Sequence, residues 1–358
     1  MRNHQSKQPL TFFVQPISYE RTSSKERKRS ENATLKSNST ITAIRGILVG
    51  NAEDRASLSG CTVVLFDSGE VLISYVTRGG WPGTFDADCI RTGMTFPRKK
   101  AIILTGGDVF GFDATIGVRK YLLEKGLSSS SGIANLPNIV GATITDTEFA
   151  EAQKIDYAQL GYLACSRAST LPVTQGNIGG GMGATVGKFG PFACAMKGGL
   201  GSVVLQLEGG IKVGALLIVN AVGNIFDIST GNTIAGSRTP EGGFTEFDEY
   251  TARNSSVMGK GTTIGVVATN VALSHENLTK VAEMADDGLA RAVRPVHMTR
   301  DGDTIFAVST AEVEPQVGSN YYDLIDVVGN AAAEAVSQAV LRGVRSAKTL
   351  NGKIGLGQ

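Results

Sequence analysis

The chain has 358 residues, of which 42% are hydrophobic and 19% charged, and its formal net charge is +1. This balance is typical of a globular protein and argues against an extended surface for nucleic acid or membrane, so neither is expected as a partner. The length allows two domains, although a large α/β fold often uses it for one. The 45 glycines predict many tight turns and close backbone approaches rather than disorder.

The cysteines and the apolar runs indicate where the protein works. Four cysteines without CxxC spacing support neither a zinc knuckle nor a dense disulfide framework: Cys61, Cys89, Cys165 and Cys194. No apolar run is long enough for a signal peptide or a membrane span. We therefore expect a soluble cytoplasmic protein, and no motif calls for a metal or cofactor.

Residues 1–39 carry eight Lys or Arg against three Asp or Glu and end in a stretch rich in Ser, Asn and Thr. This composition predicts a flexible basic extension. The KERKRS patch at 25–30 is expected to be solvated, because no aromatic residue is interleaved with its charges; contact with RNA or anionic lipid is the alternative. Residues 40–358 are expected to form a single domain.

From Thr42 the pattern changes to short runs rich in Val and Ile, separated by Gly, Asn and Asp. These runs predict strands within TAIRGILVGN, GCTVVLFDSG, VLISYVTRGG, KKAIILTGG, SVVLQLEGG and IKVGALLIVN. Helices are predicted over 114–125, 157–166, 278–293 and 322–344. In the third helix the apolar residues share one face and Ser274 is a plausible cap, so the helix is expected to pack on a flat surface.

A long polar stretch, 229–261, has hardly any periodic apolar content and precedes the β-branched run TTIGVVATNVAL, which begins at Thr262. Loops of this length are uncommon in compact domains and are usually functional or disordered. A mobile linker is therefore expected to run straight into a core strand.

The Gly261-Thr262 junction has the residues that a self-cleaving precursor needs. Glycine lets the backbone bend into a strained conformation for attack by the next hydroxyl group. Cleavage would give Thr262 a free α-amino group, which titrates near pH 7.7 to 8.0 and can take the proton of its own hydroxyl. On the dipeptide alone, an ordinary turn before a strand is the better explanation.

The three histidines argue against a conventional catalytic triad. His4 lies in the basic extension and His275 in the first turn of a predicted helix, which leaves His297. No GxSxG sequence accompanies it, so a Ser-His-Asp triad is disfavoured.

Five segments together resemble the L-aminopeptidase/D-esterase family: GNIGGGMGATVGKFG (176–190), MKGGLGS, IVNAVGNIFD, GTTIGVVATNV and DGDTIFAVST. Relatives in that family include β-peptidyl aminopeptidases and 6-aminohexanoate (nylon) oligomer hydrolases. The resemblance covers about 42–345 in the family's order. It implies an α/β fold, a four-layer α-β-β-α sandwich like that of ornithine acetyltransferase. It further implies self-cleavage into a larger chain, 1–261, and a smaller chain, 262–358, and assembly into an oligomer, for which we expect a homotetramer of processed heterodimers.

The resemblance assigns catalytic roles to five residues. Thr262 corresponds to the nucleophile, and Asn220 to an asparagine whose amide helps to hold the oxyanion. Lys188 corresponds to a lysine near the nucleophile, whose charge would lower the pKa values of the hydroxyl and α-amino groups. Asp301 and Asp303 correspond to a carboxylate pair of the nylon oligomer hydrolases that can orient an ammonium group. Each has a simpler explanation, such as a surface lysine, a turn asparagine or a DGD turn.

The glycine-rich segments predict where the main chain approaches a substrate. Gly181 and Gly183 belong to a run that lacks the preceding strand of a GxGxxG dinucleotide site, so nucleotide binding is disfavoured. We expect them, and the pair Gly106 and Gly107, to line the substrate site. Two neighbours depart from the family: Asp108 replaces a small hydroxyl residue, and Thr145 stands where relatives often have a tyrosine. Both put the usual aminopeptidase substrates in doubt.

The sequence thus predicts an amide hydrolase that forms an acyl-enzyme on Thr262 and acts on short peptides or on ω-amino acid oligomers. An acyltransferase resembling ornithine acetyltransferase remains an alternative, because that enzyme also matures at a Lys-Gly-Thr sequence, as at 260–262 here. A binding protein that keeps the fold and stays uncleaved is a second alternative.

Overall fold

The computed structural model describes residues 38–127, 136–148, 152–254, 259–315 and 321–358. The predicted basic extension, 1–39, lies almost wholly outside this range. Asn38, near its end, already contacts the domain, because its side-chain amide donates a hydrogen bond to the Thr170 carbonyl (3.2 Å).

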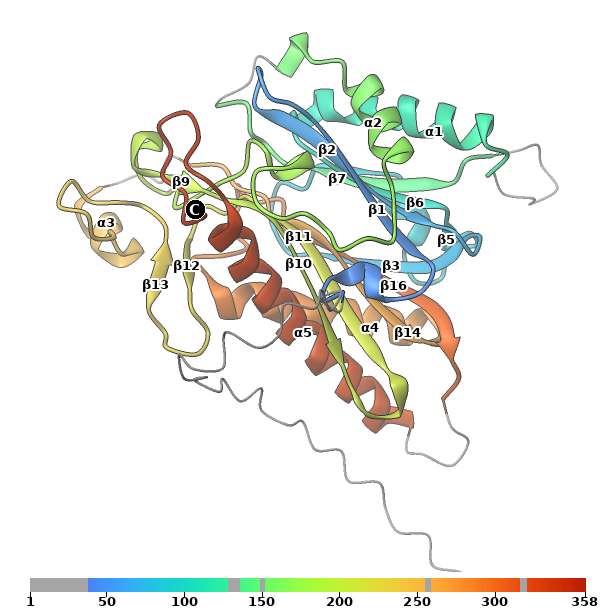
Figure 1. Cartoon of the computed structure of the whole chain (residues 1–358). Helices are drawn as coiled ribbons and strands as arrows, with labels where there is room; N and C mark the ends of the chain where they lie inside the picture. Colours follow the sequence, from blue (N-terminus) through green and yellow to red (C-terminus); the bar gives the residue numbers. More distant parts are fainter. Residues whose placement is uncertain (1–37, 128–135, 149–151, 255–258, 316–320) are drawn as a thin grey trace, which may run out of the picture.

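Two stacked β-sheets form the centre of the molecule (Figure 1). The first sheet has five strands in the order β1-β2-β6-β7-β4: β1 (Ile47–Asp54), β2 (Ser59–Phe66), β6 (Ala101–Thr105), β7 (Ile139–Thr143) and β4 (Thr84–Phe85). The second sheet has six in the order β10-β11-β14-β16-β3-β5: β10 (Gly199–Gln206), β11 (Lys212–Val219), β14 (Ile264–Val271), β16 (Thr304–Val313), β3 (Val71–Thr77) and β5 (Arg98–Lys99). Pairing is antiparallel except for β6 with β7 and β14 with β16.

Helices cover the outer face of each sheet. Helices α1 (Ala114–Glu124) and α2 (Tyr157–Ser166) pack on the five-stranded sheet, and α4 (His275–Ala292) and α5 (Tyr321–Ser346) pack on the six-stranded sheet. The predicted four-layer α-β-β-α sandwich is confirmed, as are its four predicted helices, with bounds that shift by up to three residues. Ser274 caps α4 as predicted, since its hydroxyl accepts a hydrogen bond from the Asn277 N–H group.

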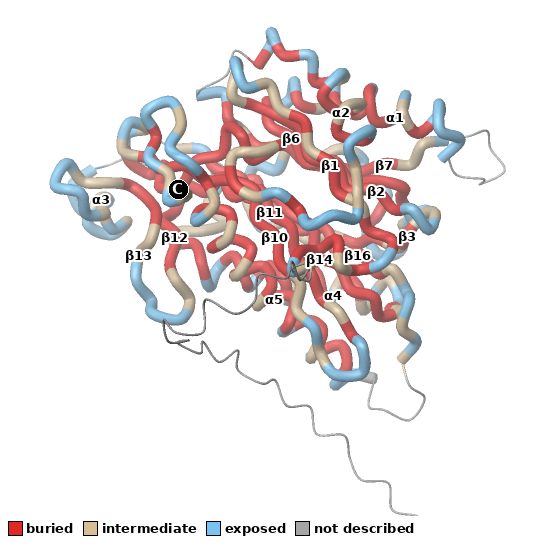
Figure 2. The backbone as a smooth tube through the Cα atoms, viewed as in Figure 1, coloured by how far each residue is buried: buried red, intermediate tan, exposed pale blue. Residues whose placement is uncertain are grey.

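Period-two alternation explains why three apolar cores form between four layers. On β14, Ile264 and Val266 face the other sheet, whereas Val267 faces the helix layer. Strand β11 divides its side chains in the same way. Because both faces of these strands are covered, all eight residues of β14 are buried, and Figure 2 shows the central strands as a buried block.

The expectation that no apolar run is long enough for a membrane span is wrong by length and composition: α5 contains such a stretch, Tyr322–Ser346, whose most apolar part has a mean hydropathy of 1.3. Within the protein, 72% of the most apolar part of this stretch is buried, mainly against α4, β10 and β11. Its composition is therefore explained by its position in the core.

The polar stretch 229–261, predicted as a mobile linker, contains regular secondary structure in its described part. Its described part contains β13 (Thr233–Ala235), which pairs with β12 (Asn224–Phe226), and the short helix α3 (Phe247–Arg253). The rings of Phe247 and Tyr250 pack against Phe189, with centroids 5.5 and 5.6 Å away. A few aromatic contacts thus order a segment without apolar periodicity. The remaining short strands are β8 (Thr185–Val186), β9 (Met196–Lys197) and β15 (Val293–Arg294).

Candidate active site

Thr262 lies two residues before β14, at the end of the six-stranded sheet, with 5% of its surface exposed. The predicted strand start at Thr262 is thus two residues early: the N–H groups of Thr262 and Thr263 donate to Asn220 and Asp303, which lie outside the neighbouring strands. The Thr262 N–H group donates to the Asn220 carbonyl (2.9 Å), and its Oγ1 atom donates to the carbonyl oxygen of Gly261. The hydroxyl therefore lies against the peptide bond that it is predicted to cut.

A main-chain donor holds the Gly261 carbonyl from the other side. The Gly302 N–H group donates to the Gly261 oxygen (3.2 Å), and Gly261 forms a parallel bridge with Asp301. A Cβ atom at position 302 would lie 2.9 Å from Thr262 Oγ1 and 2.6 Å from the Trp81 carbonyl, so only glycine fits. Such an N–H group stabilises negative charge that develops on the carbonyl oxygen. The sequence prediction missed Gly302, although it stands between the two predicted aspartates.

Lys188 and Asn220 form a buried polar pair next to Thr262, the predicted nucleophile. The Asn220 Oδ1 atom accepts hydrogen bonds from Lys188 Nζ (2.8 Å) and from the Thr185 N–H group (3.0 Å). Its Nδ2 atom donates to the Thr145 carbonyl (3.0 Å). Burial lowers the pKa of Lys188, and the charges of Glu148 and Asp301 partly oppose that shift. The surface-lysine alternative is wrong, because only 1% of Lys188 is exposed.

The two aspartates have different surroundings, although both are buried. Asp303 is fully engaged: Oδ1 accepts from the Thr263 N–H group (2.7 Å) and Oδ2 from the His297 ring and main chain (3.0 and 3.2 Å). Asp301 accepts one bond, from the Met298 N–H group (2.8 Å), and its buried Oδ1 atom has no hydrogen-bond partner among the described residues. Burial, together with the nearby charge of Asp303, raises the pKa of Asp301 to about 7.

A cavity of about 170 Å³ opens onto the Gly261-Thr262 bond. Its wall brings together the nucleophile, two predicted substrate-site residues, aromatic side chains and two cations: Trp81, Pro82, Gly83, Thr84, Asp108, Val109, Phe112, Thr145, Lys260, Gly261, Thr262 and Arg300. Asp108 Oδ2 accepts a hydrogen bond from the Thr145 hydroxyl (3.0 Å), so the two departures from the family pattern contact each other. A larger cavity of about 410 Å³, near Met182 and Lys348, is lined by none of the predicted site residues.

The predicted substrate-site glycines Gly106, Gly107, Gly181 and Gly183 do not line this cavity. A Cβ atom at Gly106 or Gly183 would lie 2.2 or 2.4 Å from the buried Asp146 carboxylate, and one at Gly107 would lie 2.2 Å from the Tyr157 hydroxyl. Gly181 packs in the same way against the Leu200 main chain (2.4 Å). Close packing around Asp146 and β10 accounts for these four glycines, and their part in substrate binding stays a prediction.

Two sheets lie between two helix layers, as in the Ntn-hydrolase fold, and a buried threonine stands just ahead of a central strand. The fold is similar to the solved L-aminopeptidase D-Ala-esterase/amidase of Ochrobactrum anthropi, a described variant of that fold, with a TM-score of 0.65. That likeness covers 89% of this chain and 91% of the other, at 18% identity.

The chain belongs to peptidase family S58, whose model matches residues 39–356, and it is an amide hydrolase. It is 36% identical over 338 residues to an uncharacterized aminopeptidase of Mycobacterium tuberculosis, which covers 87% of this chain and 95% of that protein. It is also 29% identical over 276 residues to a 6-aminohexanoate-oligomer endohydrolase of Paenarthrobacter ureafaciens, covering 75% of this chain and 74% of the relative. The predicted resemblance is confirmed.

Proposed function

We propose that the chain cuts itself between Gly261 and Thr262 and then uses Thr262 as an N-terminal nucleophile on amide bonds of short peptides or ω-amino acid oligomers. The observation that carries this proposal is the contact of the Thr262 hydroxyl with the Gly261 carbonyl, whose oxygen also accepts the Gly302 N–H group. Nucleophile, scissile carbonyl and oxyanion donor are thus together in the intact chain.

Self-cleavage follows from this arrangement in two steps. The Thr262 Oγ1 atom attacks the Gly261 carbonyl carbon, the C–N bond breaks, and the hydroxyl proton moves to the nitrogen, which leaves an ester between Gly261 and Thr262. The Gly302 N–H group stabilises the oxyanion in between. Water then hydrolyses the ester, which releases the Gly261 carboxylate and leaves Thr262 with a free α-amino group.

In the mature enzyme, the α-amino group of Thr262 acts as the general base, because α-amino groups ordinarily have a pKa of about 7.7 to 8.0 and are partly neutral near pH 7. Lys188 holds the Asn220 amide by its oxygen, so the Nδ2 atom points away from Lys188. Nδ2 carries two hydrogens, of which one binds the Thr145 carbonyl. We assign the second to the oxyanion of the substrate. Asp301 and Asp303 hold the chain on the other side of Thr262.

The cavity supports a substrate with a free amine. Asp108 contributes a carboxylate to the wall, while Trp81 and Phe112 offer apolar surface for a methylene chain or side chain. A carboxylate binds an ammonium group through charge-assisted hydrogen bonds. Short peptides with a free N-terminus and 6-aminohexanoate oligomers both satisfy this requirement.

The substrate class is tested by giving the purified, processed protein aminoacyl p-nitroanilides and 6-aminohexanoate oligomers side by side, with Thr262→Ala as the inactive control. We expect release of p-nitroaniline or of shorter oligomers, and a rise in KM for amine-bearing substrates in Asp108→Asn. An amine acceptor added to the assay distinguishes hydrolysis from acyl transfer. If the acyl group is released faster as an amide of the acceptor than as the free acid, the protein is an acyltransferase instead. No turnover of either substrate class would contradict the proposed substrates.

We propose a homotetramer of processed heterodimers as the assembled form. Apolar side chains near the cavity support an interface there, because Trp81, Val109 and Phe110 are 60%, 63% and 46% exposed. Sedimentation equilibrium of the processed protein tests the assembly, and a monomer of one larger and one smaller chain would contradict it.

A further inference from the structure

We infer that His297 is a positioning residue of this active site: as an imidazolium that bridges Asp286 and Asp303, it holds the Asp303 side chain on the Thr263 N–H group. His297 acts through Asp303 and does not touch the nucleophile. The effect of His297 on self-cleavage rests on the proposed function, whereas the charge state of the ring does not.

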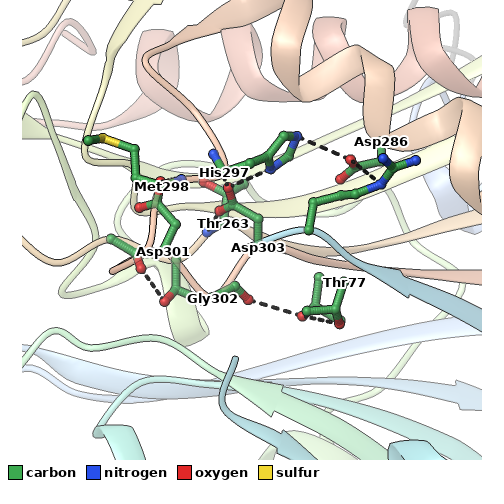
Figure 3. A network of polar contacts seen from close by, with 12 residues as sticks. Thr77, Thr263, Asp286, His297, Met298, Asp301, Gly302 and Asp303 are labelled. Atoms are coloured by element: carbon green, nitrogen blue, oxygen red, sulfur yellow. Dashed lines mark hydrogen bonds and ion pairs between the residues drawn. The ribbon is translucent and has the colours of Figure 1, made fainter. Parts of the chain in front are cut away.

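Both nitrogens of the His297 ring face carboxylate oxygens (Figure 3). Nδ1 lies 3.0 Å from Asp303 Oδ2, and Nε2 lies 3.1 Å from Asp286 Oδ2. A neutral imidazole carries one N–H group and would set a lone pair against one of these carboxylates. Only the imidazolium donates to both, so the geometry requires a charged ring.

The two carboxylates beside the ring are buried, and a second, half-exposed cation lies close to one of them. The side chains of Asp286 and Asp303 are 3% exposed and the ring is 21% exposed. Arg78, which follows β3, lies 3.7 Å from Asp286 Oδ2 and is the second cation of the group. Burial alone would lower the pKa of His297, but the hydrogen bonds and charges of Asp286 and Asp303 outweigh burial and raise the pKa to about 10.

The backbone conformation of His297 also depends on these contacts. His297 has a φ angle of 57°, in the left-handed region that a side chain other than glycine seldom adopts. Its main-chain N–H group donates to the same Asp303 oxygen as its ring (3.2 Å). A disfavoured backbone angle persists where the surrounding contacts fix it, and here those contacts are the two carboxylates.

The contacts of Asp303 connect His297 to the residues around the proposed nucleophile. Asp303 Oδ1 accepts the N–H group of Thr263, the residue after the nucleophile, so a fixed Asp303 fixes the start of β14. Asp303 also acts on Asp301: its charge, together with burial, raises the pKa of Asp301, whose Oδ1 atom lies beside Gly261 without a hydrogen-bond partner among the described residues. Lys188 is the other cation whose charge reaches Asp301. Loss of the imidazolium charge is therefore expected to disturb both aspartates.

The first test compares the pH dependence of self-cleavage in the wild type, Asp286→Asn and His297→Gln. Removing one carboxylate returns the His297 pKa toward its ordinary value of about 6.5. We divide the self-cleavage rate of Asp286→Asn by the wild-type rate at the same pH. This ratio is expected to fall about tenfold between pH 6 and pH 9, because the His297 ring of the variant loses its proton in that range. His297→Gln is expected to be slow at every pH. Glu283→Gln, on the same helix and 43% exposed, is the matched control with an unchanged profile.

The second test observes the ring directly and does not depend on cleavage. The chain has three histidines, so histidine-selective isotope labelling of the Thr262→Ala protein gives few NMR signals to assign. One of them is expected to stay protonated to at least about pH 9 and to titrate at least one pH unit lower after Asp286→Asn.

The outcomes separate this inference from the proposed function. If the wild type is not cut at Gly261-Thr262, the proposed function fails, while the NMR titration still decides the state of His297. A His297 signal that titrates near pH 6.5, or an Asp286→Asn rate in constant ratio to wild type at every pH, would overturn the inference.

Discussion

Gly302 shows how one residue without a side chain determines the geometry of the site. Its N–H group reaches the Gly261 carbonyl because nothing stands between them, and a Cβ atom there would meet Thr262 Oγ1 at 2.9 Å. The residue has no functional group, so nothing in its chemistry marks it in a sequence.

The first residue-scale prediction is that Gly302→Ala slows self-cleavage at least about tenfold, because the methyl group displaces either the nucleophile or the N–H donor. Time courses on denaturing gels measure this. Gly243→Ala is the matched control, since its Cβ atom would meet nothing closer than Thr239 Oγ1 at 3.5 Å. Equal rates in the two variants would show that Gly302 is not needed.

The raised pKa of Asp301 predicts that the free energy of unfolding depends on pH. Its pKa is raised to about 7 in the folded chain, above the 3.8 of an unperturbed carboxyl group, so the folded state binds more protons between these values. Ionisation of Asp301 therefore lowers the stability of the fold as the pH rises through this window. Asp301→Asn removes the titrating group and keeps an oxygen for the Met298 N–H group.

We expect Thr262→Ala/Asp301→Asn to gain thermal stability over Thr262→Ala as the pH rises from 5 to 8, measured as the difference in Tm. The Thr262→Ala background keeps both proteins in one chain. A Tm difference that does not change with pH would mean that Asp301 titrates normally.

Five catalytic candidates could be named before the structure, but only through the family resemblance. The contacts among them join segments far apart in the chain, as between Lys188 and Asn220. His297 was set aside because no nucleophile motif accompanied it, and its partner Asp286 is a single charged residue among the buried, mostly apolar positions of α4. Spacing along the sequence carries no signal for such a contact.

At the scale of elements, periodicity and capping predicted most of the fold. Ser274 accepts the Asn277 N–H group and begins α4. We expect Ser274→Ala, in the Thr262→Ala background, to lower the free energy of unfolding by about 1 kcal/mol, and Ser274→Gly by only a few tenths. Urea unfolding measures both. Equal losses would show that the hydroxyl is not acting as a cap.

The polar stretch before the cleavage site is the element that the sequence could not predict. Apolar periodicity detects a helix that covers a core, whereas α3 is held by Phe247 and Tyr250 against one buried ring, Phe189. Likewise, β13 has only three residues and forms because β12 offers an edge. Elements that depend on a single distant partner leave little trace in local sequence.

At the scale of the whole molecule, the larger and smaller chains of the proposed self-cleavage would share one sheet. Strand β14 of the smaller chain pairs with β11 of the larger chain on one side and with β16 of the smaller chain on the other. Helices α4 and α5 of the smaller chain cover the same sheet. The cores are thus shared, and the two chains are expected to co-elute after cleavage until a denaturant separates them.

Intact-mass spectrometry of the wild type and Thr262→Ala is the most direct test of the central claim. We expect two denatured fragments from the wild type, with a new N-terminus at Thr262, and one species near 37.4 kDa from Thr262→Ala. A wild-type chain that stays intact after long incubation, or that is cut at another bond, would contradict the account.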